Sequence, residues 1–315
     1  MRRATAVAHA NIALVKYWGK RDEALLLPES PSLSIALDRL FTTTTVELGV
    51  PSDSLVLDGR AAGEGELRRA RFLLDAAGIG EGARIESRNS FPTAAGLASS
   101  ASGFAALAVA ACAAAGQKHT SRELSALARR GSGSAARSVP GGWAVWEDEF
   151  AEEVAPPGHL PIRAVIALCG EGKKDVGSRD GMKRSQDTSP YHAAFIAQCR
   201  RDYLEARALL RDRNLSALGA LAESNALRMH ADALAANPPI LYWEPPTVSC
   251  LQALRRLRDG GLGAWATIDA GPHVVALCAP EDAPRVESTL RAIAGVGDVL
   301  VCAPAGGARV VEGDR

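Results

Sequence analysis

Residues 92–112 read PTAAGLASSASGFAALAVAAC, a loop of small residues that runs directly into an alanine-rich segment of helical character. Gly96 allows a ligand to approach the backbone closely, and the serines after it bring hydroxyl groups to the helix entrance. Unpaired N–H groups and the positive end of the helix dipole attract anions there. The spacing is not the G-x-x-x-x-G-K-[ST] of a P-loop, so a Walker-type NTPase is not indicated. The stretch predicts a phosphate cradle, although ordinary capping with tight helix packing would produce the same composition.

Strands and helices are predicted on both sides of this stretch. Before it, the pattern predicts strands at 42–48 and 83–86 and a helix at 66–77. After it, Thr120 and Glu123 form a capping-box pattern for a helix that ends at Gly131. Because helices and strands do not strictly alternate, we expect an α+β fold with two lobes. The later elements are strands at 143–146, 163–168, 264–268 and 274–277, helices at about 189–211, 215–235, 245–260 and 283–294, and two short final strands.

Length and composition are those of a compact enzyme with one or two domains. The chain has 315 residues, of which 47% are hydrophobic and 23% charged, so it can bury a sizeable core. The formal net charge is zero, which removes any global electrostatic attraction to nucleic acid or to an anionic membrane. Any binding of anions must therefore be local.

Cysteines and the N-terminus indicate a cytoplasmic protein. The six cysteines show no C-x-x-C spacing and lie mostly in apolar runs, which is typical of buried thiols in a reducing compartment. Arg2 and Arg3, followed by ATAVAHA, imitate a signal peptide. However, His9, Asn11 and Lys16 interrupt the apolar segment, and no apolar run reaches the ~18 residues of a membrane span. We therefore expect neither export nor membrane insertion.

Four further segments occur in the order found in one enzyme family. Together with GLASSAS they resemble diphosphomevalonate decarboxylase, of the GHMP kinase superfamily, from about residue 6 to about residue 280. The resemblance implies a GHMP-kinase-type α+β fold, with an N-terminal nucleotide-binding lobe (residues 1–175), a ferredoxin-like C-terminal lobe (176–315) and a site in the cleft between them. The segments are HANIALVKYWGKRD (9–22), RRGSGSAARS (129–138), ESNALRMHADALAANPP (223–239) and TIDAGPH (267–273).

The resemblance implies a specific reaction, the ATP-dependent decarboxylation of mevalonate 5-diphosphate to isopentenyl diphosphate in the mevalonate pathway. This substrate carries a diphosphate at one end, a carboxylate at the other and a tertiary hydroxyl between them. The hydroxyl leaves poorly until it is phosphorylated by ATP. The site then needs cations for both anionic ends, a magnesium–phosphate clamp and a carboxylate near the hydroxyl. ATP and Mg²⁺ are the implied cofactors, and a homodimer is the implied assembly.

Three residues are implied to be catalytic. Asp269 falls where a predicted strand ends, a usual place to present a functional side chain, although a lone D-A-G-P is more often a turn. The family motif makes Asp269 the carboxylate that deprotonates or orients the tertiary hydroxyl, and both roles stay open. Arg137 suits the substrate carboxylate because a guanidinium can hold it with two parallel hydrogen bonds. Lys16 is implied to orient the reacting group beside Asp269.

Further residues are implied to bind substrate or nucleotide. The ordinary alternatives are a solvated basic patch for KYWGK and a flexible linker for GSGS. Magnesium ligands are not assigned, and Mg²⁺ is expected to be held by the ATP phosphates and Ser100. Asn225 and His230 are expected to support the lobe interface. The implied substrate-binding residues are Asn11, Tyr17, Lys20, Ser132, Ser134, Ser178, Arg179 and Met182. The implied nucleotide-binding residues are Ser87, Gly96, Leu97, Ala98, Ser99, Ser100 and Ser102, with the arginines at 68, 69 and 71 as weak candidates.

Two positions depart from the family pattern, and alternatives within the superfamily stay open. His273 stands where D-A-G-P is usually followed by Asn, and Pro31 stands where Asn or Ser is common. A relative that decarboxylates the monophosphate, or one that phosphorylates mevalonate without decarboxylation, would show similar motifs. A non-catalytic binding module on this fold is a more remote alternative. The joint presence of Asp269, Lys16 and Arg137 favours decarboxylation over a kinase.

Overall fold

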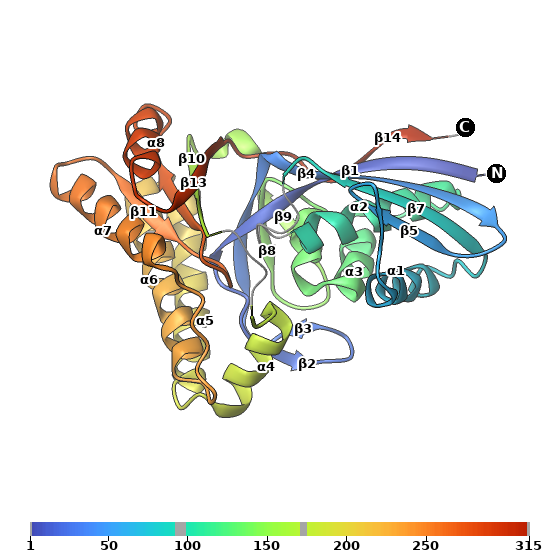
Figure 1. Cartoon of the computed structure of the whole chain (residues 1–315), viewed down its shortest axis with the longest axis horizontal. Coiled ribbons are helices and arrows are strands. Elements are labelled where there is room, and N and C mark those ends of the chain that lie inside the picture. Colours follow the sequence, from blue (N-terminus) through green and yellow to red (C-terminus); the bar gives the residue numbers. More distant parts are fainter. Residues whose placement is uncertain (1, 92–98, 171–174, 314–315) are drawn as a thin grey trace.

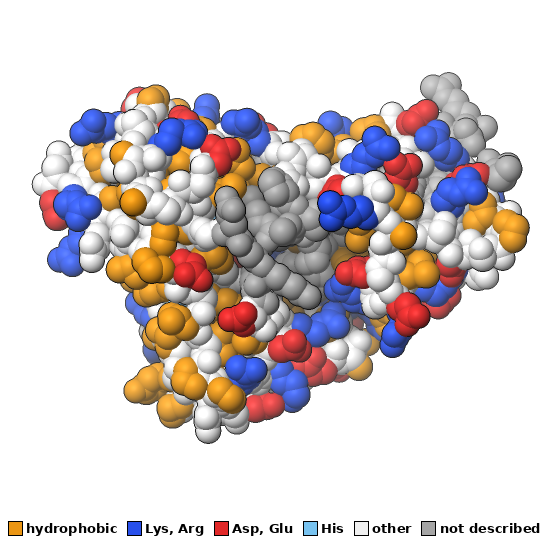
Figure 2. All heavy atoms as spheres, viewed as in Figure 1, with side chains coloured by type: hydrophobic (Ala, Val, Ile, Leu, Met, Phe, Trp, Pro, Cys, Tyr) orange, Lys and Arg blue, Asp and Glu red, His pale blue; other side chains and the backbone are white. Residues whose placement is uncertain are grey.

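The structure is a computed structural model that describes residues 2–91, 99–170 and 175–313. Figure 1 shows two lobes side by side, with most of the first half of the chain on the right and most of the second half on the left. Both termini lie at the outer end of the right-hand lobe. No helix among the described residues is long and apolar enough to cross a membrane. Basic and acidic side chains are interspersed over the face seen in Figure 2.

An eight-stranded sheet forms the frame of the first lobe. Its main path runs β14-β1-β4-β7-β5-β6, and β8 joins β4 to β9. The two longest strands, β1 and β4, pair antiparallel along almost their whole length. The strands are β1 (Arg2–Val15), β4 (Ser32–Val50), β5 (Ser54–Leu57), β6 (Arg60–Ala61), β7 (Gly82–Asn89), β8 (Trp143–Trp146), β9 (Ala151–Ala155) and β14 (Arg309–Gly313).

Three helices and a short hairpin complete this lobe. α2 (Ser99–Ala114) is buried on nearly all sides, because its alanines allow it to lie against β1 and β4 without large side chains between them. α1 (Glu64–Ala76) and α3 (Ser121–Gly131) pack beside it. Thr120 and Glu123 form the expected capping box at the start of α3. The hairpin of β2 (Lys20–Asp22) and β3 (Leu27–Pro28) projects below the sheet in Figure 1.

The second lobe packs helices on a four-stranded antiparallel sheet. The strand order is β11-β12-β10-β13, with β10 between β12 and β13. The strands are β10 (Arg163–Cys169), β11 (Ala264–Thr267), β12 (Val274–Cys278) and β13 (Val296–Cys302). The helices are α4 (Ser178–Thr188), α5 (His192–Arg211), α6 (Leu215–Leu234), α7 (Pro245–Asp259) and α8 (Ala283–Arg291).

One hydrophobic core joins the two lobes. It contains Leu14 of β1 and Ile35 of β4 together with Phe195 of α5, Leu218 of α6 and Ile166 of β10. The expected α+β class and the two lobes are both present. The domain boundary at residue 175 stays a prediction. It separates β10 from the other strands of the four-stranded sheet.

Several elements were missing from the sequence-based expectation, and two of them, β1 and α4, carry site residues or lead to them. The N-terminal segment forms a 14-residue strand, β1, for which no strand was predicted. The segment around VGSRDGM opens a helix, α4, for which no helix was predicted. The expectation of buried thiols is confirmed, because all six cysteines are free and buried.

Candidate active site

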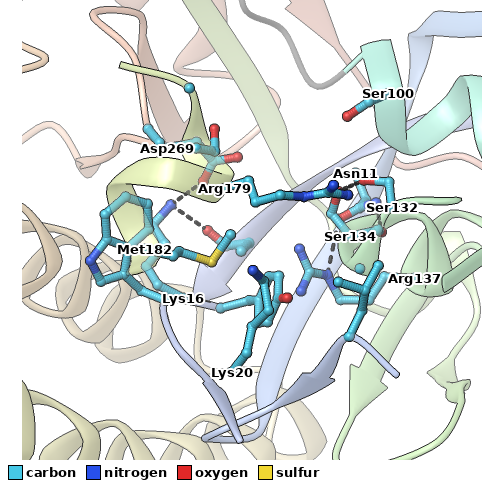
Figure 3. Close-up of a pocket in the computed structure, with 18 of the residues that line it drawn as sticks. Asn11, Lys16, Lys20, Ser100, Ser132, Ser134, Arg137, Arg179, Met182 and Asp269 are labelled. Atoms are coloured by element: carbon cyan, nitrogen blue, oxygen red, sulfur yellow. Dashed lines mark hydrogen bonds and ion pairs between the residues drawn. The ribbon is translucent and has the colours of Figure 1, made fainter. Parts of the chain in front are cut away.

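A cavity of about 370 Å³ lies between the lobes. Its walls come from the end of β1, the 3-10 helix Gly133–Ser138, the start of α4 and the turn after β11. Every residue predicted to be catalytic or to bind substrate lines it. Figure 3 shows most of these side chains projecting into the same space. The lining includes Asn11, Lys16, Tyr17, Lys20, Ser132, Ser134, Arg137, Ser178, Arg179, Met182 and Asp269.

An ion pair between Lys16 and Asp269 lies on one side of the cavity. Lys16 Nζ donates to Asp269 Oδ1 at 2.6 Å and to the Ala13 carbonyl at 2.8 Å. The lysine side chain is 1% exposed and the aspartate side chain 38% exposed, so the carboxylate is the partner that reaches the solvent-filled space. Burial lowers the pKa of Lys16, and the charge of Asp269 opposes this effect. The lysine thus fixes the carboxylate from the buried side.

Arg137 lies across the cavity in a buried, hydrogen-bonded position. Its Nε donates to Asn11 Oδ1 at 3.0 Å and its Nη1 donates to Ser32 Oγ at 2.9 Å. The rings of Tyr17 and Trp146 lie 6.0 and 5.8 Å from its guanidinium carbon. Burial lowers the pKa of Arg137 to about 10, which still leaves the group charged at neutral pH. Among the described residues no carboxylate lies within ion-pair distance of it.

Two more guanidinium groups, both more exposed than that of Arg137, face the cavity. Arg179 of α4 and Arg69 of α1 line it, and neither forms an ion pair within residues 2–91, 99–170 and 175–313. Arg69 lies over the ring of Phe104, 5.5 Å from its centroid, and burial followed by the charge of Arg179 lowers its pKa. Lys20 differs, because its Nζ donates to Glu23 Oε2 at 2.7 Å. Cations without carboxylate partners make the cavity a site for a polyvalent anion.

Tyr17 offers a further donor. Its hydroxyl is buried and has no hydrogen-bond partner among the described residues, and burial raises its pKa, so it stays neutral. A Cβ atom on Gly133 would lie 2.6 Å from that hydroxyl, which explains a glycine at this position. The G-S-G-S segment is therefore an ordered wall of the cavity, where Ser132 Oγ and Ser134 Oγ lie 3.4 Å apart.

A second cavity of about 180 Å³ opens beside the first. The two share Arg69, Ser99 and Ser100 at the N-terminal end of α2. Ser87 lines the second cavity, as predicted for a nucleotide-binding residue, and its hydroxyl lies 2.6 Å from Thr44 Oγ1. The apolar lining consists mainly of Leu55, Leu57, Ile85, Phe104 and Leu107.

The remaining nucleotide-binding predictions have different outcomes. Gly96, Leu97 and Ala98 lie outside the described residues. Ser102 is fully buried and its hydroxyl lies 2.6 Å from Thr42 Oγ1. Within the described part of the chain Ser102 lines neither cavity, so its contact with a cofactor stays a prediction.

Supporting contacts surround the site. Asn225 Oδ1 accepts a hydrogen bond of 2.8 Å from the Lys16 amide, which joins α6 to the end of β1. His230 lies beside the backbone of Asp269, and burial followed by the charge of Lys16 lowers its pKa to about 4. His273, which departs from the family pattern, accepts a hydrogen bond of 3.0 Å at Nδ1 from the Cys169 amide. This bond joins the turn after Asp269 to β10.

Sequence reasoning undervalued Arg69 and did not find Ser32. Arg69 was only one of three neighbouring arginines on a predicted helix, and no sequence signal separates the one that faces the cavity. Ser32 is a partner of Arg137 from a distant strand, so its role depends on tertiary contact alone. Ser32 stands next to Pro31 in a segment of the family pattern, but its contact with Arg137 has no local signal.

Two family models match the chain over most of its length. The diphosphomevalonate decarboxylase-like N-terminal domain matches residues 8–154. The mevalonate 5-diphosphate decarboxylase C-terminal domain matches residues 164–301. Diphosphomevalonate decarboxylase mvd1 of Aspergillus fumigatus is 36% identical, over 93% of this chain and 81% of the relative.

Solved structures are similar over nearly the whole chain. Mevalonate diphosphate decarboxylase from Staphylococcus aureus is 34% identical with a TM-score of 0.94, and the match covers 99% of this chain and 98% of that one. A structure described as MDDEF in complex with MVAPP, AMPPCP and magnesium is 35% identical with a TM-score of 0.92, over 99% of both chains.

Proposed function

The chain belongs to the diphosphomevalonate decarboxylase family, and from that premise we infer how its cavity performs the ATP-dependent decarboxylation of mevalonate 5-diphosphate. The products are isopentenyl diphosphate, ADP, phosphate and carbon dioxide. One observation carries the assignment of roles. Three guanidinium groups without carboxylate partners among the described residues, those of Arg69, Arg137 and Arg179, surround the Lys16–Asp269 pair.

Arg137 is assigned to the carboxylate of the substrate. This role is supported by the burial of Arg137, because a buried cation costs free energy unless an anion pairs with it. The carboxylate of the substrate supplies that anion. Asn11 and Ser32 hold Nε and Nη1, so the guanidinium plane is fixed before the substrate arrives. A fixed plane also fixes the direction in which carbon dioxide departs.

The diphosphate end is assigned to a second group of donors in the cavity. Lys20, Arg179 and the neutral hydroxyl of Tyr17 supply charge and hydrogen bonds, and Met182 packs against the carbon chain. The support for Tyr17 is its buried hydroxyl, which lacks a partner among the described residues. Ser132, Ser134 and Ser178 complete this set.

Asp269 is assigned to the tertiary hydroxyl. A carboxylate there orients the O–H group and stabilises the positive charge that develops at the tertiary carbon when phosphate leaves. Lys16 holds Oδ1, so the carboxylate cannot rotate freely. Its orientation is therefore set before the substrate binds.

The residues of the second cavity fit ATP. The apolar side chains of Leu55, Leu57 and Leu107 suit a purine base, and the cavity opens towards the N-terminus of α2, where phosphates are favoured. ATP supplies the phosphoryl group that converts the tertiary hydroxyl into a leaving group, and Mg²⁺ neutralises its phosphates. The described residues include no cluster of three His, Cys, Asp or Glu side chains that could hold a metal ion. Mg²⁺ held mainly by phosphates, with Ser100 beside them, suits such a site.

Product analysis with three substrates tests the proposal. Purified protein is incubated with ATP, Mg²⁺ and either mevalonate, its 5-phosphate or its 5-diphosphate. We expect carbon dioxide from the diphosphate and very poor reaction of mevalonate, because lost remote binding energy lowers turnover as well as affinity. Preference for the monophosphate would keep the chemistry and overturn the substrate assignment.

Two properties of the whole protein are also proposed. A homodimer is supported by exposed apolar side chains on and near α5 and α6, and light scattering in solution would test it. A cytoplasmic location is supported by six free, buried thiols, which persist in reducing compartments. We keep 1–175 and 176–315 as the proposed domains. The exposed apolar side chains are Tyr191, Leu204, Leu227, Leu234 and Leu241.

A further inference from the structure

Three charged side chains from distant parts of the chain meet beside the substrate-binding turn. His192 Nδ1 lies 2.8 Å from Asp232 Oδ2, and His192 Nε2 lies 3.0 Å from Glu29 Oε2. Glu29 follows β3, His192 begins α5 and Asp232 lies near the end of α6. The histidine side chain is 8% exposed and that of Asp232 is 0% exposed. The three therefore form a carboxylate–imidazole–carboxylate bridge that is closed to solvent at Asp232 and His192 and partly open at Glu29, whose side chain is 26% exposed.

The bridge requires a proton on each imidazole nitrogen. Ionised carboxylates only accept hydrogen bonds, so two such bonds need the doubly protonated imidazolium. Asp232 Oδ1 is buried and has no hydrogen-bond partner among the described residues. His192 is therefore the group that compensates the negative charge of this carboxylate. Burial lowers the pKa of His192, but the hydrogen bonds that the ring donates to Asp232 and Glu29, with the charges of these carboxylates, outweigh it, and the pKa is raised above 6.5.

The bridge contacts the turn that carries the substrate-binding residues. Gly19 has φ +140°, and a Cβ atom there would lie 2.6 Å from Glu29 Oε2 and 3.2 Å from His192 Nε2. The Gly19 carbonyl accepts from the Glu29 amide at 3.1 Å. Lys20 follows directly, and Gln186 of α4 bonds both its amide and its carbonyl group. A shift of Glu29 would therefore move Gly19 and Lys20 together.

We propose that His192, with Glu29 and Asp232, is a proton-dependent clamp that positions Lys20 and Tyr17 for the diphosphate of the substrate. His192 is a positioning residue, because it acts through Gly19 and touches no reacting atom. The inference rests on the proposed role of Lys20 and Tyr17. On α5, the charged Arg200 also contacts the clamp, because it donates to the Glu29 carbonyl at 3.1 Å. Phe195 supplies an apolar ring contact.

The sign of the pH effect follows from the bonding. The folded pKa of His192 is raised, so the clamp is complete below about pH 6.5 and is lost as the pH rises through the folded pKa. When the proton leaves, one nitrogen lone pair faces a carboxylate oxygen. The KM for mevalonate 5-diphosphate should then rise, while kcat changes less, because the Lys16–Asp269 pair does not contact the clamp.

The substitution Glu29→Gln distinguishes a proton-dependent clamp from a contact that is merely structural. The side-chain amide introduced by this substitution can donate to a neutral Nε2 while Nδ1–H still donates to Asp232, so the clamp no longer needs the second proton. We expect the KM of the wild type to rise roughly tenfold between about pH 6 and about pH 9, and that of Glu29→Gln to rise far less. His192→Phe should show a raised KM at every pH. His119→Gln, at an exposed site in the other lobe, is the matched control and should follow the wild type.

Two readouts decide the proposal independently of each other. Equal pH dependence of KM in the wild type and in Glu29→Gln would overturn the clamp, as would an unchanged KM in folded His192→Phe. If the wild type released no carbon dioxide, the proposed function would fail instead. NMR titration of the His192 ring then still tests the clamp. A wild-type midpoint above about 6.5 that falls in Glu29→Gln supports it, and an equal midpoint in both proteins contradicts it.

Discussion

At the scale of single residues, the cavity combines one ion pair with three arginines that have no carboxylate partner among the described residues. Lys16 and Asp269 pair at 2.6 Å, whereas Arg137 is buried without a carboxylate among the described residues. A charge placed in this way costs free energy in the absence of ligand, and binding of an anion recovers it. The arrangement separates two tasks. The pair acts on the tertiary hydroxyl, and Arg137 holds the carboxylate that will leave.

Asp269→Asn should abolish turnover while the fold and nucleotide binding remain. The amide keeps the shape of the side chain but loses its charge and basicity, and loss of such an element costs on the order of 10²–10⁴ in rate. Steady-state kinetics and nucleotide titration measure the two effects. Asp259→Asn, at an exposed position at the end of α7, is the control and should behave as wild type. Turnover above roughly a tenth of wild type would show that Asp269 is not catalytic.

Arg137→Lys should be a poor substitute although the charge is kept. An ammonium group cannot make two parallel hydrogen bonds to a carboxylate while also bonding Asn11 and Ser32. We expect turnover to fall more than the affinity for ATP, and the exposed Arg255→Lys to change neither. Weakened nucleotide binding at an unchanged catalytic rate would instead place Arg137 on the ATP side.

At the scale of elements, much of the structure follows from local sequence signals. The capping box at Thr120, the proline start of α7 and the glycine after it define helix ends that the sequence alone predicts. β1 was missed because its buried residues face the interior on both sides, so its sequence lacks the alternation of a surface strand. α4 was missed because its sequence is strongly polar. Few of its side chains are buried, and contacts with distant residues hold it in place.

Gly181 shows how α4 depends on such contacts. A Cβ atom there would lie 2.2 Å from Tyr242 Oη and 3.0 Å from Trp18 Cη2. Gly181→Ala should push the helix away from Trp18 and displace Ser178 and Arg179 from the cavity.

We expect this substitution to raise the KM for mevalonate 5-diphosphate and to lower the free energy of unfolding by about 1–3 kcal/mol, as overpacking does. Enzyme kinetics and urea unfolding measure both. Gly65→Ala is the matched control, because that helical glycine has open space around it. Equal effects of the two substitutions would show that the close packing of α4 is not what positions its side chains.

At the scale of the whole molecule, a shared core holds two lobes around one cavity. The end of β1 carries Lys16 into the core beside α6, and the turn after β11 brings Asp269 to meet it. The sequence motifs predicted this meeting only through resemblance to a family. No local signal in the sequence indicates that two residues 253 positions apart lie close together. The clamp at His192 could not be predicted for the same reason, since its three members stand in three separate segments.

The shared core also affects acid stability. Burial followed by the charge of Lys16 lowers the pKa of His230 from 6.5 to about 4, so the unfolded chain binds one more proton between these values. The free energy of unfolding should therefore fall as the pH drops from about 6.5 to about 4, by on the order of 3 kcal/mol from this group.

His230→Asn should flatten this dependence. Urea unfolding across the same pH range measures it, and the exposed His119→Gln should keep the wild-type slope. A His230→Asn protein with the same loss of stability on acidification would show that the buried imidazole is not its source.

We infer that one cavity phosphorylates and decarboxylates the same molecule. It is tested by following ADP and labelled carbon dioxide together in one reaction of the purified protein with ATP, Mg²⁺ and carboxyl-labelled mevalonate 5-diphosphate. We expect both products to form at the same rate and in equal amounts, and both to be lost in Asp269→Asn. Formation of ADP without labelled carbon dioxide would contradict it and make the protein a kinase.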